Sequence, residues 1–191
     1  MKKVSILFLY LALPIFAQQR FEIWVESNLI KLSEKIALNL IGEKEIKENR
    51  SEMIDKINRT MGLPLGSNYC QAGQYYTYFH AYKILNKEEY NGWPVPRNGL
   101  AISTFLNAKK YGKKANKYFG KKNDFIIWKA KNSSFGHIER IYSDLGKGWV
   151  ETIGFNVSIG DKEGIAFKRR NIIFPLNRIK VILGIVGINE K

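Results

Sequence analysis

The chain contains a single cysteine, Cys70, which follows a turn at Gly66 and stands at the start of a helical pattern. At the first turn of a helix, unpaired backbone N–H groups and the helix dipole lower the pKa of a thiol. The same N–H groups can bind an oxyanion. This position therefore predicts a nucleophile, and the alternative is an inert buried thiol, because free cysteine is among the residues most often buried.

A cysteine nucleophile needs a base, and the chain offers two histidines. His80 lies on the same expected helix, roughly 15 Å along the axis from Cys70 at 1.5 Å per residue, which is too far for a hydrogen bond. We interpret His80 as a helix histidine packed among aromatic residues. His137 follows Gly136 at the start of an expected strand, and a strand that crosses the helix start would present it to the thiol. His137 is therefore the predicted base.

The imidazole in turn needs an acceptor that orients it. Asn156 is the first choice, because Gly154 permits a bend that would direct the Asn156 side chain toward the neighbouring strand. Glu151 is the rival, and Glu139 lies two residues after His137 on the same face of its strand. Each of the two acids could instead be an exposed charge on a strand.

Hydrophobic periodicity predicts the elements that must position these groups. Apolar residues at helical spacing predict helices over about 20–41, 51–61, 67–85 and 101–111. Ser51 is the expected N-cap of the second helix, and Ser67 or Asn68 that of the third. After a basic loop over 113–122, strand patterns cover 124–128, 136–142, 149–153, 165–174 and 180–188. Helices followed by an antiparallel meander predict one α+β domain, with a helical part over about 20–112 and a sheet part over about 123–188.

The first residues have the pattern of a signal peptide. Lys2 and Lys3 precede an apolar run over 4–16 that is too short to span a bilayer comfortably, and Ala17 offers a cleavage point. We expect residues 1–17 to be removed on export to the periplasm or the exterior, leaving residues 18–191 without stable membrane insertion. An uncleaved N-terminal anchor is the alternative. One cysteine excludes an internal disulfide, and with two histidines a structural zinc site is excluded, so no cofactor is expected.

The formal charge of the whole chain is +14. Loss of the signal peptide would leave 29 basic and 17 acidic residues, a charge of +12. A basic exported protein favours an anionic partner such as a cell-wall polymer or an outer-membrane surface, although solubility alone would also explain the charge. Nucleic acid fits the charge but not the export signal, and no nucleic-acid-binding motif is recognisable, so this partner is not expected.

Four short blocks of the chain resemble, in order, the blocks of CHAP-type and NlpC-like cysteine peptidases. The blocks are Asn68–Ala72, Lys122–Trp128, Phe135–Ile138 and Thr152–Asn156. The segments 48–55 and 168–170 also resemble the entering and closing segments of that domain, so the likeness covers roughly residues 43–188. These enzymes have a papain-like fold and cut amide bonds of peptidoglycan.

The resemblance implies a papain-like fold in which Cys70 is the nucleophile, His137 the base and later the acid, and Asn156 the orienting residue. The backbone N–H of Cys70 and the side chain of Asn68 would hold the oxyanion. Two positions depart from the pattern. Gly154 stands where such proteins often carry an acid, and Glu139 stands where many have glycine. The third member therefore stays open between Asn156 and Glu151.

The expected function is that of a secreted or periplasmic amidase or endopeptidase that acts on peptidoglycan as a monomer. The aromatic side chains of Tyr69, Trp93 and Trp128 and the loop over 92–99 are expected to line the cleft, with core packing as the alternative. Two other functions stay open. A catalytically idle domain could bind the cell wall or serve a structural role, and an interbacterial toxin could use the same chemistry on another cell.

Overall fold

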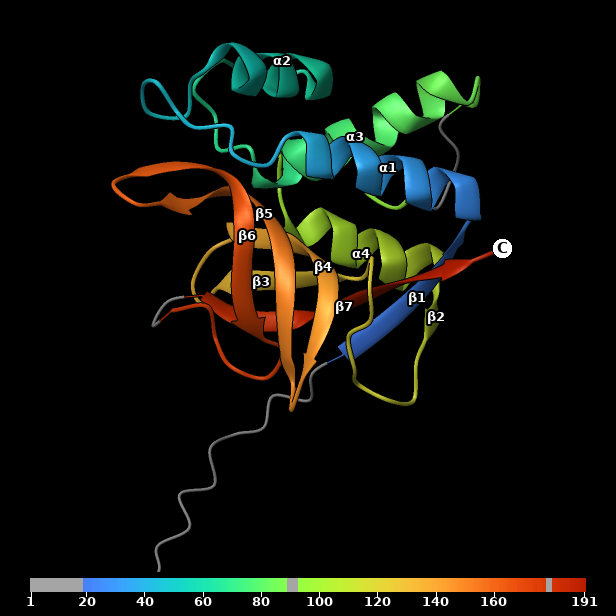
Figure 1. Ribbon diagram of the computed structural model, residues 1–191. Helices are drawn as coiled ribbons and strands as arrows, with labels where there is room; N and C mark the ends of the chain where they lie inside the picture. Colours follow the sequence, from blue (N-terminus) through green and yellow to red (C-terminus); the bar gives the residue numbers. More distant parts are fainter. Residues whose placement is uncertain (1–18, 89–92, 178–179) are drawn as a thin grey trace, which may run out of the picture.

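A computed structural model of the chain describes residues 19–88, 93–177 and 180–191. The expected signal peptide at residues 1–17 lies outside these ranges. The described residues form four helices and a seven-stranded sheet, an α+β arrangement in which helices lie over one face of a curved sheet (Figure 1). None of the helices in these ranges combines the length and the apolar character needed to cross a bilayer.

The sheet has the strand order β2-β1-β7-β3-β4-β5-β6. Its strands are β1 (Gln19–Val25), β2 (Lys113–Lys114), β3 (Phe125–Ala130), β4 (Gly136–Gly146), β5 (Trp149–Ile159), β6 (Lys162–Asn171) and β7 (Lys180–Glu190). Strands β3 to β6 form the expected antiparallel meander, and β7 returns antiparallel to β3. The five strands predicted from the later part of the sequence are therefore confirmed.

The first predicted element is partly wrong. Residues 20–41 were expected to form one helix, but the chain first forms β1, which pairs parallel to β7. Phe21, Ile23 and Val25 are buried and alternate with more exposed residues, which is the period of a strand and not of a helix. The helix α1 (Ser27–Asn39) follows. A strand therefore precedes the first helix, contrary to the expected order. In the expected basic loop over 113–122, the first two residues form the short strand β2.

The other three helices occur where they were predicted: α2 (Glu52–Met61), α3 (Cys70–Ile84) and α4 (Ile102–Tyr111). Ser51 caps α2 as expected, since its hydroxyl accepts a hydrogen bond from the Ile54 N–H at 3.2 Å. The expected cap of α3 is wrong. This helix begins only at Cys70, its preceding residue is Tyr69, and no side chain caps it.

The helix α3 is the centre of the molecule. It contacts α1 and α2 on one side and β4 and β5 on the other. Gly73 allows the close approach to the sheet, because a Cβ atom there would lie 2.0 Å from the Phe155 ring. The main core fills this interface. A second, smaller cluster lies on the opposite face of the sheet and contains Ile126, Trp128, Ile141, Val150, Ile172, Ile182 and Ile185.

Candidate active site

Cys70 is the first residue of α3 and borders a cleft of about 560 Å³. The thiol side chain is largely buried, with 7% of the residue exposed. Apolar walls of the cleft come from Leu63, Leu100 and Phe135. His137 borders the same cleft. The helix start expected to carry a nucleophile therefore faces a space that a substrate could enter.

His137 is the second residue of β4 and lies beside the Cys70 thiol, near enough to favour its ionised form. The glycine before it permits this placement, because a Cβ atom on Gly136 would lie 2.2 Å from the Trp128 carbonyl oxygen of the adjacent strand. The imidazole Nε2 lies 2.9 Å from a carboxylate oxygen of Glu139, which leaves Nδ1 for the thiol. The structure thus brings together the predicted nucleophile and the predicted base.

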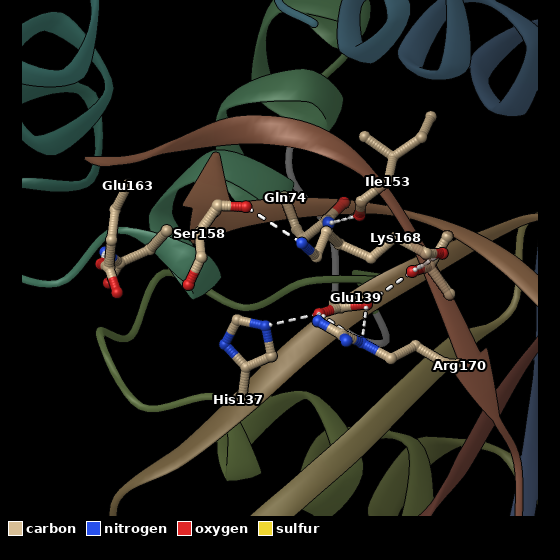
Figure 2. Close-up of polar contacts among 10 residues, drawn as sticks. Gln74, His137, Glu139, Ile153, Ser158, Glu163, Lys168 and Arg170 are labelled. Atoms are coloured by element: carbon tan, nitrogen blue, oxygen red, sulfur yellow. Dashed lines mark hydrogen bonds and ion pairs between the residues drawn. The ribbon is translucent and has the colours of Figure 1, made fainter. Parts of the chain in front are cut away.

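Glu139 is the group that orients the imidazole (Figure 2). Its carboxylate is fully buried and also accepts hydrogen bonds from the Thr152 hydroxyl and from Nε and Nη2 of Arg170, the last at 2.7 Å. Gly154 lies directly opposite on β5, and a Cβ atom there would approach the carboxyl carbon to 3.2 Å. The missing side chain at Gly154 leaves room for this carboxylate.

Asn156 and Glu151 were the two residues expected to orient His137, and both expectations are wrong. Neither side chain hydrogen-bonds to the imidazole, which contacts Glu139 instead. Asn156 sits at an irregularity of β5 with φ of 58°, and its amide donates to the Asn49 side chain and to Glu163. It borders the cleft but makes no hydrogen bond to the imidazole. Glu151 precedes Thr152 on β5, and neighbouring strand residues point to opposite faces, so Glu151 points away from Glu139.

The charges of the three groups stabilise one another. Burial alone would lower the pKa of His137, but hydrogen bonds and charge from Cys70 and Glu139 outweigh it and raise the pKa to about 9. Burial alone would raise the pKa of the Cys70 thiol, yet the contact with His137 leaves it below its ordinary value. Burial also opposes ionisation of Glu139, whereas His137 and Arg170 hold its pKa at about 2. Near neutral pH the site therefore holds an imidazolium between a carboxylate and a thiol whose ionisation it favours.

Asn68, which was expected to contact the oxyanion, lies at the cleft, whereas the three aromatic residues expected to line the cleft do not. Asn68 borders the cleft beside the start of α3. The structure places the three aromatic residues in the core. The Tyr69 hydroxyl donates to Glu45, Trp93 stacks on Tyr82, and Trp128 lies in the second cluster with its ring 5.8 Å from that of His137. In the loop expected over 92–99, residue 92 lies outside the described ranges and Gly99 borders the cleft.

The other histidine lies in α3 as expected, away from the thiol. The His80 ring packs against Tyr76 at 4.1 Å and against Phe79 at 5.4 Å between ring centroids. Burial lowers the pKa of His80, so this histidine is neutral at physiological pH. Its aromatic neighbours and its place on the helix fit the predicted structural role.

Sequence reasoning missed three contributors to the site: Thr152, Arg170 and Lys180. Thr152 and Arg170 had a signal, since they lie in the block Thr152–Asn156 and in the basic segment 168–170, whereas Lys180 had none. No group of three or more metal-binding side chains comes together within the described ranges.

No family model, curated protein or solved structure matches this chain.

Proposed function

We propose that this protein is an exported cysteine hydrolase with a papain-like fold that cleaves an amide bond of peptidoglycan. The observation that carries the proposal is the row of Cys70, His137 and Glu139 at a helix start beside a cleft, in which Glu139 hydrogen-bonds to the imidazole next to the thiol. A nucleophile, a base and a group that orients the base are the three parts that thiol hydrolysis requires.

In this mechanism the Cys70 thiolate attacks the carbonyl carbon of the substrate amide. The developing oxyanion is held by backbone N–H groups at the start of α3, where the first turn has no intrahelical acceptors. Imidazolium at His137 gives its proton to the leaving amine, and a thioester acyl-enzyme remains. His137 then takes a proton from water, the resulting hydroxide attacks the thioester, and the acid product leaves with regeneration of the thiol.

An idle domain explains the site less well. Glu139 is a fully buried carboxylate, and Arg170 beside it keeps only 20% of its side chain exposed. Burying such charges costs several kcal/mol of desolvation, by a rough estimate for an ion in a protein interior. A merely structural domain would be equally well or better stabilised by apolar residues at these positions, whereas a catalytic site needs the charge next to the imidazole.

Peptidoglycan as the substrate is supported by the resemblance of the sequence blocks and by the positive charge of the chain. The cleft also carries charges of both signs, with Lys180 and Glu163 among its lining residues. Such a cleft suits a peptide that bears both amino and carboxyl groups, as the peptides of cell walls do.

The test is mass spectrometry of purified peptidoglycan fragments after incubation with wild type, Cys70→Ala and His137→Gln. New fragments with a free amine and a free carboxyl group are expected from wild type and not from Cys70→Ala or His137→Gln. His80→Gln is the matched control, because it removes the other histidine without touching the site, and it should cut as wild type does. Equal products from wild type and Cys70→Ala would refute the proposed hydrolase.

A further inference from the structure

A small pocket of about 150 Å³ lies at the edge strand β6, away from the catalytic cleft. Its lining includes Trp128, two consecutive arginines, Arg169 and Arg170, and Asn171. The rest of the lining is aromatic or apolar: Trp149, Phe174, Pro175 and Leu176. No carboxylate is among the lining residues. The pocket therefore holds two guanidinium groups, of which Arg170 is paired with Glu139 and Arg169 has no ion pair among the described residues.

Several hydrogen-bond donors of this pocket lack acceptors within the described part of the chain. Trp128 is 1% exposed, and its buried indole N–H has no hydrogen-bond partner there. Arg170 donates hydrogen bonds from Nε and Nη2 to Glu139, and its Nη1 group has no hydrogen-bond acceptor among the described residues. The side-chain oxygen of Asn171 accepts a hydrogen bond from the Ile173 N–H. The side-chain NH₂ group of Asn171 donates no hydrogen bond to any described residue. Of these donors only the Trp128 indole N–H is buried, and a buried donor without an acceptor is costly, so a ligand that supplies an acceptor would be favoured.

The position of Arg169 adds to the same pocket. Its guanidinium stacks over the Trp149 ring at 5.0 Å and makes no ion pair within the described ranges. A guanidinium held flat by an aromatic ring is already ordered and offers a fork of N–H groups that fits a carboxylate or a phosphate. The volume corresponds to roughly five water molecules at about 30 Å³ each, enough for one such group but not for a sugar ring with its substituents.

We propose that this pocket binds a small oxyanion, a phosphate or carboxylate group, through Arg169, Arg170 and Asn171 above the indole of Trp128. The ligand lies on the far side of Arg170 from Glu139. One guanidinium then bridges the bound anion and the carboxylate that orients His137. The pocket is thus a second binding site, with an electrostatic link to the catalytic row.

The binding test is calorimetric titration of the full chain with inorganic phosphate and separately with acetate, at constant ionic strength kept with chloride. Saturable one-to-one binding of at least one of them is expected, and the two titrations distinguish phosphate from carboxylate. Arg169→Gln should weaken binding by about tenfold or more, the usual cost of a lost charge-assisted hydrogen bond. Trp128→Phe should also weaken it while keeping an aromatic ring in the second cluster.

Lys117→Gln is the matched control, since it removes one exposed positive charge outside the pocket, and it should bind as wild type does. Arg169 is exposed, so its variant is expected to fold even if Trp128→Phe does not. Absence of saturable binding in wild type, or equal affinity of wild type and Arg169→Gln, would overturn the proposed site.

The link to the catalytic row has its own readout, the pH dependence of Cys70 alkylation by iodoacetamide with and without the bound anion. A negative charge beside Arg170 opposes ionisation of nearby acids, so the profile should move to higher pH. The shift should vanish in Arg169→Gln. Saturable binding with an unchanged profile would overturn the link through Arg170. Because neither measurement needs turnover, both hold whether or not peptidoglycan is the substrate.

Discussion

Replacing Glu139 by glutamine tests the reasoning about the site most directly. The substitution keeps the size and shape of the side chain but removes the charge that faces the imidazole. The carboxylate now accepts hydrogen bonds from His137, Thr152 and Arg170. In Glu139→Gln the imidazolium loses its buried counter-charge, so the pKa of His137 should fall. The pKa of the Cys70 thiol should rise in turn, because its thiolate is stabilised by that imidazolium.

The magnitude follows from the pKa of His137. Its value of about 9, against an ordinary 6.5, corresponds to about 3 kcal/mol in favour of the imidazolium at about 1.4 kcal/mol per pH unit. Cys70 and Glu139 share this stabilisation. Since the folded-state pKa is raised, the contribution to stability is present below pH 6.5 and is lost as the pH rises through about 9. The free energy of unfolding of wild type should therefore fall over that range, and that of Glu139→Gln should change less.

The assay is the rate of iodoacetamide alkylation of Cys70 between pH 4 and pH 10, followed by mass spectrometry of the intact protein. The chain has no other cysteine, so a single added mass reports this thiol alone. Wild type should react at lower pH than a free thiol does, because His137 lowers the pKa of the Cys70 thiol. In Glu139→Gln the midpoint should move to higher pH, by about one unit if half of the 3 kcal/mol is lost.

Glu151→Gln is the matched control, because it removes a carboxylate from β5 on the face that points away from His137. Its alkylation profile should overlay that of wild type. A Glu139→Gln profile identical to that of wild type would refute the role of Glu139. An equal shift in Glu151→Gln would show that general charge, and not the contact with the imidazole, sets the reactivity of the thiol.

Two further predictions concern the elements that position the site. Gly73→Ala should destabilise the fold by about 1–3 kcal/mol, because the added methyl group overlaps the Phe155 ring, and Phe155→Leu in the same chain should restore part of the loss in chemical denaturation. No recovery in the double variant would contradict this packing argument. Asp124→Asn should cost about 3–5 kcal/mol in the same assay, because it removes the fully buried counter-charge that pairs with the buried Arg20 at 2.6 Å. Glu22→Gln is its control, since the Glu22 carboxylate also pairs with Arg20 but is partly exposed, and a loss as large as that of Asp124→Asn would refute the argument from burial.

The sequence predicted most of the elements, and its errors have physical causes. Residues 20–41 contain enough apolar residues to match a helix, and the alternation of Phe21, Ile23 and Val25 was hidden within that longer match. What makes this segment a strand is β7, which contributes the parallel partner from the other end of the chain. A pairing between the two ends leaves no local signal, so only the three-dimensional arrangement reveals it.

The structure brings the local parts of the predicted site together, and it does not place the expected orienting residues beside His137. A cysteine at a helix start and a histidine after a glycine are features of short segments, and the structure brings both together. The expected lining by Tyr69, Trp93 and Trp128 failed because aromatic residues serve a core as well as a cleft. Burial, and not residue type, decides between the two, and burial depends on which elements pack together.

The orienting group shows most clearly what a pattern along the chain cannot specify. The cysteine peptidases that the sequence blocks resemble often carry an acid two residues before the asparagine. In this chain that position, before Asn156 on β5, is Gly154. In the sheet, however, Gly154 lies directly across from Glu139 on β4. Facing residues on antiparallel strands have Cβ positions only about 5 Å apart, so a carboxylate from either strand can reach the same point beside an imidazole. The acid and the glycine that differ from the resembled pattern therefore occupy facing positions on adjacent strands. Gly154 leaves space on β5, and the carboxylate of Glu139 from β4 occupies it. That carboxylate supplies the negative charge beside the His137 imidazole.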